Sequence, residues 1–188
     1  SQGEGHRDSV VFRGVRSTAD FYRDGLRDDV QYFRSLYNVE QVEVLRGPNA
    51  LLFGRGGTGG LINRVTKKAM IGQSGGSFDA GSDTFGAFDV AADFNIQTSE
   101  SSALRINAHR DSLENHRNFY DGQRVGFNPT FRMELGQDTT LDLSYEHANH
   151  ERFIDRGIPT ENGVPVEGLA DVVFGTPDLN VQRLTADI

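Results

Sequence analysis

Apolar and polar residues alternate along most of the chain after residue 76. In the clearest run, residues 88–96, every second side chain is apolar, and the side chains between them are polar or small. A period of two residues is typical of a β-strand that has one apolar face. The same alternation recurs in residues 104–108, 125–135 and 141–145. We therefore predict a meander of antiparallel strands for the second part of the chain.

The connections between these runs differ in length. They are short at residues 82–83 and 136–138, polar at 97–102, longer at 113–122 and longest from residue 151 onward. A soluble antiparallel sandwich and a transmembrane β-barrel both produce such a pattern, because each has one apolar and one wet face. Periodicity alone leaves both architectures open.

The first part of the chain has a mixed pattern. Residues 9–16 are predicted to form a short strand, and residues 21–28 a hairpin, because Asp24-Gly25 is a strong turn signal. Apolar side chains then recur at helical spacing across residues 32–39, which predicts a short amphipathic helix. Strands combined with this helix make the first part an α+β segment.

A further strand and a glycine-rich turn follow. The alternation over residues 42–46 stops at Gly47-Pro48, because proline has no backbone donor and cannot extend a strand ladder. Five of the seven residues from 54 to 60 are glycine. Glycine permits positive φ and close backbone approach, so we expect this segment to fold tightly against its neighbours.

Charge and composition change between the two parts. We place the boundaries at residues 1–69, a linker at 70–75, and 76–188. Residues 1–68 hold 11 Lys and Arg against 8 Asp and Glu, while the remainder holds 8 against 19. A basic segment seated in an acidic surrounding gains from complementary fields, although two mixed solvated surfaces explain the same numbers equally well. There is no cysteine, so no disulfide can form.

The stretch from Val42 to Lys67, with Arg46-Gly47-Pro48 and the later glycines, carries a family resemblance. It resembles the end of the plug domain of TonB-dependent outer-membrane receptors, most closely the ferric-siderophore receptors of the ferrichrome type. Arg13-Gly14 resembles an internal strand of the same domain, and residues 155–159 and 174–180 resemble a long extracellular loop. The resemblance implies a plug followed by the first strands of a transmembrane β-barrel of about 22 strands.

The resemblance also implies a function and partners. A receptor of this kind binds and imports a ferric siderophore across the outer membrane of a Gram-negative cell, using energy relayed by the TonB-ExbB-ExbD complex. Iron is carried only as the siderophore chelate, and no cofactor is implied. Outer-membrane lipid is the further expected partner, and nucleic acid is not expected as one. The chain has no signal peptide and ends without a closing strand, so we expect it to be an internal part of a longer receptor.

Particular residues acquire roles through the resemblance. Arg13 and Arg46 match plug arginines that pair with glutamates of the barrel wall. Residues near the plug apices are candidates for ligand contact, and packing onto the plug core is the alternative role for Tyr32 and Phe33. The ligand-contact candidates are Ser17, Thr18, Gln31, Tyr32 and Phe33, and the turn motif comprises Gly47, Pro48, Gly54, Gly59 and Gly60.

The glycines also satisfy a competing motif. Gly54-x-Gly56-x-x-Gly59 has the spacing of a dinucleotide-binding loop, with Asp79 twenty residues later. Residues 61–69 even suit a helix face after it. However, no further βα units follow to build a parallel sheet.

Other candidate chemistry is weak. His147 and His150 suggest a metal site, but on a strand they point to opposite faces. No nucleophile stands beside a positioned base in a recognisable motif, so we expect no catalytic residues and no enzyme. Besides the receptor, a soluble β-rich binding protein stays open, and a nucleotide-binding enzyme is a third alternative.

Overall fold

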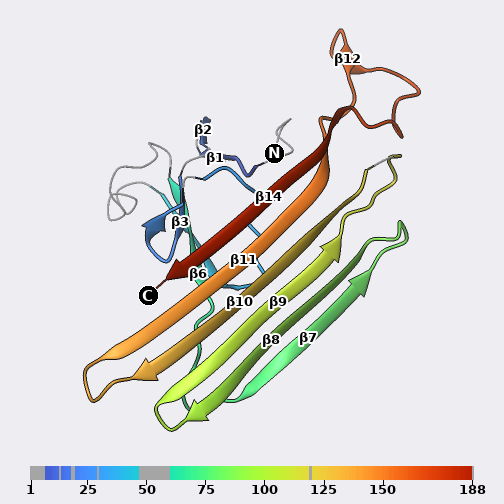
Figure 1. Ribbon diagram of the computed structural model, residues 1–188. Coiled ribbons are helices and arrows are strands. Elements are labelled where there is room, and N and C mark those ends of the chain that lie inside the picture. The colour runs from blue at the N-terminus through green and yellow to red at the C-terminus, as the bar shows by residue number, and fades with distance from the viewer. Residues whose placement is uncertain are drawn as a thin grey trace. The chain divides into compact units, whose positions relative to one another are not determined.

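The computed structural model describes residues 7–187 except 13, 18, 19, 29, 47–59 and 119. The chain divides into two compact units, Ser1–Lys67 and Lys68–Ile188. Every regular element among the described residues is a β-strand (Figure 1). None of the described segments is a helix long and apolar enough to cross a membrane.

The first unit contains a four-stranded sheet with the order β4-β3-β6-β5. Strand β3 runs parallel to β6, while β5 runs antiparallel to it. Asp24 and Gly25 join β3 to β4 with φ of 50° and 81°, which confirms the predicted hairpin turn. The strands are β3 (Phe21–Arg23), β4 (Leu26–Arg27), β5 (Val39–Leu45) and β6 (Leu61–Thr66).

The single strand predicted for residues 9–16 is instead a hairpin. Strand β1 (Val10–Phe12) pairs antiparallel with β2 (Val15–Ser17). Gly14 lies between them with φ of 82°, a left-handed conformation that glycine adopts at little cost. Alternation of side chains cannot by itself distinguish one strand from two that reverse at a glycine.

The helix predicted for residues 32–39 is wrong, and the α+β description of the first unit is not confirmed among the described residues. The described residues from 30 to 38 are irregular, and β5 begins at Val39. The backbone carbonyls of Asp28, Val30 and Tyr32 accept hydrogen bonds from the Arg34 guanidinium. The Arg34 side chain thus binds backbone carbonyl groups at the start of the expected helix. A helix of this length has little stability of its own, so it does not form against these contacts.

The second unit is dominated by one antiparallel sheet of six strands, the large sheet, with the order β14-β11-β10-β9-β8-β7 (Figure 1). All four predicted runs are strands of this sheet. The expectation of one long loop from residue 151 onward is wrong, because β11 continues to Asp155 and residues 175–187 return to pair with it. The strands are β7 (Gly75–Ser82), β8 (Phe88–Ser99), β9 (Ser102–Ser112), β10 (Gly122–Glu134), β11 (Thr140–Asp155) and β14 (Gly175–Asp187).

The connections of the large sheet are unequal at its two ends. At one end, β8 to β9 and β10 to β11 are joined by residues 100–101 and 135–139. At the other end lie the longer loops 113–121 and 156–174, the second of which carries a small hairpin of β12 (Thr160–Glu161) and β13 (Val164–Pro165). Short turns on one side and long loops on the other are typical of outer-membrane barrels, whose long loops face outward.

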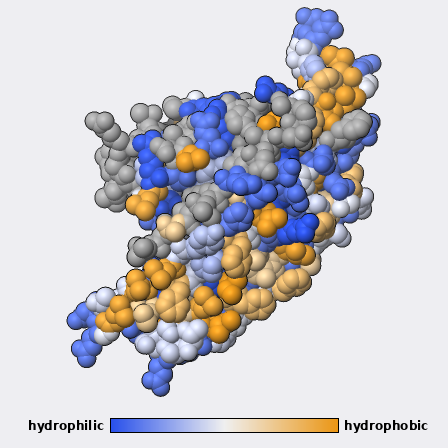
Figure 2. Space-filling model, viewed as in Figure 1, coloured by the Kyte–Doolittle hydropathy of each residue, from blue (hydrophilic) through white to orange (hydrophobic). Residues whose placement is uncertain are grey.

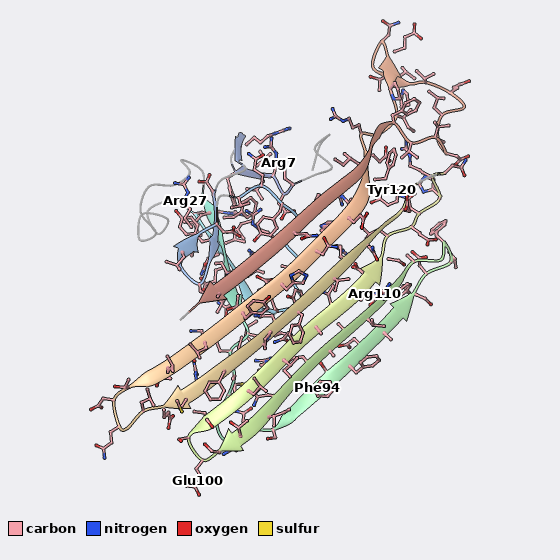
Figure 3. The ribbon with its side chains drawn as sticks, in the orientation of Figure 1. Arg7, Arg27, Phe94, Glu100, Arg110 and Tyr120 are labelled. Carbon is pink, nitrogen blue, oxygen red and sulfur yellow. The ribbon has the colours of Figure 1, made fainter. Side chains whose placement is uncertain are left out.

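The two faces of the large sheet have opposite character. One face, the apolar face, exposes large apolar side chains: Phe78 is 67% exposed, Phe94 45% and Phe127 43%. In Figure 2, apolar surface, coloured orange, is prominent over the large sheet. Figure 3 labels one of the side chains of this face, Phe94. The opposite face, the polar face, carries the alternate residues of the same strands, including Asp93, Arg105, Asn107, Asp111, Arg124, Asn128, Arg132, Asp142 and Glu146.

Candidate functional site

An ion-pair cluster occupies the interior of the first unit. One carboxylate oxygen of Asp28, Oδ2, accepts hydrogen bonds from the Tyr32 hydroxyl at 2.6 Å and from Arg64 Nη2 at 2.7 Å. Arg34 Nε approaches the same oxygen at 3.2 Å. All four side chains are buried. Buried charges are tolerated only when they are paired and hydrogen-bonded, so Asp28 holds this part of the unit together.

Arg34 is fixed from several directions. Its guanidinium carbon lies 4.0 Å from the centre of the Phe21 ring and 4.5 Å from that of Tyr32. Its backbone amide donates to Asp8 Oδ2 at 2.9 Å. Burial lowers the pKa of Arg34, and the negative charge of Asp28 opposes that effect. Stacking, ion pairing and three carbonyl contacts together suit arginine's planar fork, which lysine does not reproduce.

Strand β6 is anchored by polar contacts to its neighbours. Asp24 accepts hydrogen bonds from the Thr66 amide at 2.8 Å and its hydroxyl at 2.7 Å. The Asn63 side-chain nitrogen Nδ2 donates to the Glu43 carboxylate at 2.8 Å, while its side-chain oxygen Oδ1 accepts a hydrogen bond from the backbone amide of Gly25. These bonds tie the hairpin turn and β5 to the same strand.

Of the predicted turn motif, the structure describes Gly60. Gly60 has φ of 148°, and a Cβ there would lie 2.7 Å from the Leu45 carbonyl oxygen. The close approach predicted from the glycine run is therefore confirmed at this position. The other predicted members of the motif, Gly47, Pro48, Gly54 and Gly59, lie outside the described residues.

The structure describes only one of the two arginines that are expected to pair with barrel glutamates. Arg46 directly follows β5, and its side chain is exposed. Arg13 lies outside the described residues. The expected pairing stays a prediction for both.

The predicted ligand-contact residues whose side chains the structure describes differ in exposure. Tyr32 is 7% exposed and its hydroxyl lies within the Asp28 cluster, whereas Phe33 is half-buried. Gln31 is exposed and accepts a hydrogen bond from Arg7. Ser17 ends β2, and Thr18 lies outside the described residues. A contact with ligand at these positions stays a prediction.

The polar face of the large sheet carries ion pairs that sequence reasoning did not single out. Arg105 reaches both carboxylate oxygens of Asp93 at 2.8 Å. Arg132 holds Asp142 through Nε at 2.6 Å and Nη2 at 2.8 Å. Arg124 and Asp111 form a third pair between neighbouring strands. The sequence does place opposite charges at polar positions of adjacent predicted strands. Which charges lie side by side, however, depends on the strand register, which the sequence does not give.

Two asparagines lie deep on the same face. Asn107 is completely buried, and neither atom of its amide has a hydrogen-bond partner among the described residues. Asn128 is 1% exposed and donates to the Tyr145 carbonyl at 2.6 Å. These two amides are therefore shielded from water, whereas Arg132 and Asp142 on the same face are partly exposed.

The two long loops of the large sheet are joined to each other. Arg117 Nε pairs with Asp155 Oδ2 at 3.1 Å, and its Nη2 donates to the Val172 carbonyl. The Asn118 amide donates to the Asp171 carbonyl at 2.8 Å. Loops 113–121 and 156–174 therefore form one connected surface at this end of the sheet.

The dinucleotide alternative does not fit the described geometry. Residues 61–66 form strand β6, where the motif requires a helix directly after the glycines. Asp79 lies on β7, which belongs to the second unit. The prediction of a helix face over residues 61–69 is therefore wrong.

The histidines lie as strand geometry requires. His147 is exposed on the apolar face of β11, and His150 is half-buried on the opposite face. Within the described ranges, no three Asp, Glu, His or Cys side chains come together as a metal site.

Comparisons with known proteins agree with this architecture. The TonB-dependent Receptor Plug Domain family matches residues 1–61. The probable TonB-dependent receptor BfrD of Bordetella pertussis is 36% identical over 171 residues, which is 87% of this chain and 23% of BfrD. The metal-pseudopaline receptor CntO of Pseudomonas aeruginosa is 34% identical over 148 residues, covering 74% of this chain and 20% of CntO.

A solved structure extends the agreement to the fold. The catecholate siderophore receptor Fiu of Escherichia coli K12 is 32% identical over 185 residues, covering 92% of this chain and 22% of Fiu. The crystal structure of its closed form superposes with a TM-score of 0.78 over 85% of this chain and 23% of that one, at 29% identity. The chain thus spans between 20% and 23% of these relatives.

The order of the chain, a plug-like unit and then an antiparallel sheet with one apolar face, is that of an outer-membrane receptor with a plug and a barrel. The chain belongs to the TonB-dependent receptors, and residues 1–61 match the plug domain of that family. The protein is located in the outer membrane of a Gram-negative cell.

Proposed function

We propose that this chain is part of a receptor that binds a ferric siderophore outside the cell and imports it through the outer membrane. Import is driven by energy that the TonB-ExbB-ExbD complex relays to the plug. Iron enters as the siderophore chelate, so the transport cycle needs no resident metal or cofactor and no catalytic step of its own.

The observation that carries this proposal is the order of the two units. A plug-domain match over residues 1–61 precedes an antiparallel sheet that exposes Phe78, Phe94 and Phe127 on one face and pairs charges on the other. A large outward apolar face suits lipid, and a polar face suits a barrel lumen. A soluble sandwich would bury such aromatic side chains between its sheets.

The plug residues take the following roles in the proposal. Arg46, which is exposed after β5, and Arg13 pair with carboxylates of the barrel wall and hold the plug in place. Residues of the plug apices contact the chelate: Ser17, Thr18, Gln31, Tyr32 and Phe33. The glycines and the proline of the turn motif, Gly47, Pro48, Gly54, Gly59 and Gly60, are the family's turn residues in this proposal.

A second substrate class is supported by one relative. CntO is described as a receptor for metal-pseudopaline and resembles this chain at 34% identity, close to the 32% of the catecholate receptor Fiu. A metal chelate other than a ferric catecholate is therefore the alternative cargo.

Uptake by the complete receptor tests the proposal. The full-length gene that contains this chain is expressed in a strain lacking its own siderophore receptors, and accumulation of labelled iron is measured with a ferric catecholate. We expect uptake that disappears in a matched strain without TonB. Labelled metal-pseudopaline, supplied in parallel, distinguishes the second cargo. Absence of uptake with both chelates, from a receptor shown to be in the outer membrane, contradicts the proposal.

A further inference from the structure

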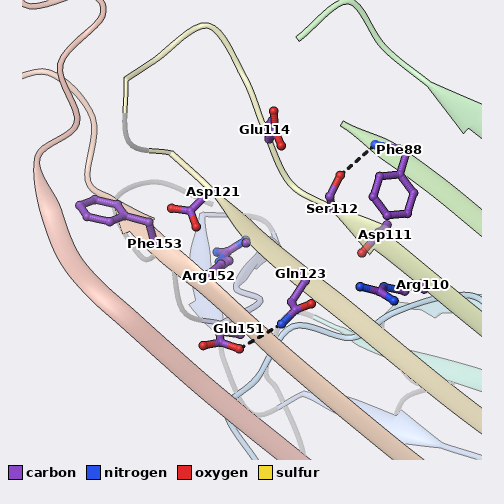
Figure 4. Close-up of a pocket in the computed structure, with 11 residues that line it drawn as sticks. Phe88, Arg110, Asp111, Ser112, Glu114, Asp121, Gln123, Glu151, Arg152 and Phe153 are labelled. Atoms are coloured by element: carbon purple, nitrogen blue, oxygen red, sulfur yellow. Dashed lines mark hydrogen bonds between the residues drawn. The ribbon is translucent and has the colours of Figure 1, made fainter. Parts of the chain in front are cut away.

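Two cavities of the large sheet lie towards its opposite ends. The cavity at the loop end, of about 340 Å³, is lined by side chains of β8 to β11 and of loop 113–121 (Figure 4). The other, of about 240 Å³, lies nearer the turn that joins β8 to β9, and its lining includes Met70, Gln73 and Ser74. These three residues belong to residues 68–74, the connecting segment, which runs between β6 and β7. The second cavity therefore marks where this segment meets the sheet.

Asn95, on the polar face of β8, holds the backbone of the connecting segment with its side chain. Its Oδ1 accepts a hydrogen bond from the Met70 amide at 2.9 Å, and its Nδ2 donates to the Met70 and Gln73 carbonyls, each at 2.8 Å. Both donor hydrogens of the carboxamide are thus used. Asn95 is 5% exposed. The side chain pairs with Met70 as the backbone of a neighbouring strand would.

A second attachment holds the start of the connecting segment. Arg105, on β9, donates from Nη1 to the Lys68 carbonyl at 3.2 Å while its other nitrogens bind Asp93. The Lys68 ammonium lies 3.5 Å from Asp142 Oδ2. Ala69, which follows Lys68, is buried. The segment is therefore bound to the polar face from its first residue, and all of these contacts lie within the second unit.

The connecting segment reverses direction between the two residues that Asn95 binds. Gly72 lies in this turn with φ of 83°, and a Cβ there would meet no atom within 4 Å. Glycine is thus required for its conformation and not for close packing. Beyond the turn, the Gln97 amide donates to Ser74 Oγ at 3.0 Å. Asn95 closes the turn from Met70 to Gln73, and the bond to Ser74 fixes the entry into β7.

We propose that Asn95 is a positioning residue for transport, which fixes the connecting segment to the barrel wall and so limits how far the plug is displaced. This role rests on the proposed function, in which TonB relays energy to the plug. A force applied to the first unit passes along the chain to the next fixed point, and that point is the connecting segment. While Asn95 holds it, the plug rearranges with its last residues kept at the wall. Once released, the plug moves further and opens a wider passage.

The full-length receptor with Asn95→Leu tests this role. Leucine is similar in size to asparagine but neither donates nor accepts hydrogen bonds. Amide exchange in residues 68–74 should accelerate at least about tenfold, because several hydrogen bonds are lost together. Vancomycin, a glycopeptide that an intact outer membrane excludes, measures the passage in cells. We expect the variant to lose vancomycin resistance in cells with TonB and to keep it in a matched strain without TonB.

Matched variants separate this role from a general effect of the substitution. Gln97→Met makes a similar change two residues later on the same face, where the side chain donates to the Ser99 carbonyl, and should behave as the wild type. Gly72→Val strains the turn without altering β8, because a β-branched residue is disfavoured at positive φ, and should reproduce the TonB-dependent sensitivity. Gly75→Val is its control, since Gly75 has open space and no positive φ. Heat-modifiability on a gel establishes that each variant is folded.

Two outcomes overturn the positioning role. One is equal amide exchange and equal vancomycin resistance in Asn95→Leu and Gln97→Met. The other is sensitivity of Asn95→Leu cells that is the same with and without TonB, which would make the segment a part of barrel closure alone. Uptake by the wild-type receptor, measured in parallel, separates the two proposals. Absence of that uptake contradicts the proposed function, whereas normal uptake with either outcome contradicts only the role of Asn95.

Discussion

The two units of this chain place charge and apolar surface in opposite ways. In the first unit, Asp28, Arg34 and Arg64 are 6%, 9% and 5% exposed, and aromatic rings pack around them. In the large sheet, Phe78 is 67% exposed and Phe94 45%. The first unit keeps these ions in its interior, while the sheet exposes its aromatic rings. The difference follows from the surroundings, since only lipid makes an exposed aromatic face favourable.

The comparison also shows how a polar interior is kept satisfied. The first unit concentrates its charges on one acceptor, Asp28 Oδ2, which three donors share. The polar face of the large sheet instead distributes them as separate arginine–aspartate pairs along the strands. Removing the shared acceptor of a cluster disrupts all of its hydrogen bonds at once, whereas removing one member of a separate ion pair disrupts that pair alone.

The largest effect is expected for Asp28→Asn in the full-length receptor. This change removes the carboxylate that Arg34 and Arg64 share, and Arg34 keeps only a longer ion pair with Asp8 at 3.6 Å. Breaking a buried ion pair typically costs about 3–5 kcal/mol. Amide hydrogen exchange should accelerate in residues 20–45 and 60–66. Glu40→Gln, at an exposed position of β5, serves as the control and should change little. Equal exchange in the two variants would show that the cluster does not hold the first unit together.

A slightly smaller effect is expected for Phe127→Arg on the apolar face. A cation placed against lipid near mid-bilayer costs about 2–4 kcal/mol. We expect impaired folding of the full-length receptor into lipid vesicles, and the same holds for Phe88, Val90 and Leu143. The control is Ser77→Arg, an exposed position on the polar face. Asn128 on the same face is unsuitable as a control, because its side chain is buried and hydrogen-bonded. If both faces tolerate arginine equally, the apolar face does not contact lipid.

Arg46→Ala tests whether this arginine holds the first unit in the barrel of the full-length receptor. If Arg46 pairs with a wall carboxylate, its loss removes charged hydrogen bonds of about 1.5–3 kcal/mol. Amide exchange in residues 42–46 and 60–66 should then accelerate, and siderophore uptake should fall while binding stays near normal. Arg27→Ala, on the exposed strand β4, is the control cation. Uptake and exchange that match the control would make Arg46 an ordinary solvated residue.

The smallest effect is expected for Tyr32→Phe. The hydroxyl of Tyr32 contacts both Asp28 and Arg64, so its removal should destabilise the first unit by about 1–2 kcal/mol. Chemical denaturation measures this loss, and siderophore titration of the same variant measures ligand affinity. Reduced stability with unchanged affinity assigns Tyr32 to packing. Reduced affinity with unchanged stability makes it a ligand contact instead.

The sequence by itself determined most strands and one turn. Alternation located the strands around residues 88–96, 104–108, 125–135 and 141–145, because a period of two is a local property of a strand with two different faces. Asp24-Gly25 located a hairpin because only a few residues adopt positive φ easily. The resemblance at residues 42–67 gave the family, since a plug motif can be read without knowing its contacts.

Only the tertiary structure decided the rest, because it depends on contacts between residues far apart in the chain. The helix expected at residues 32–39 gave way to carbonyl contacts with Arg34 and to the pairing of Asp28 with Arg64, 36 residues later. Strand β14 followed from pairing with β11 rather than from its own pattern. The strand register placed Arg124 beside Asp111 and Arg110 between two valines. A one-residue shift would have exchanged the two faces, so no property of the individual strands could fix these neighbours.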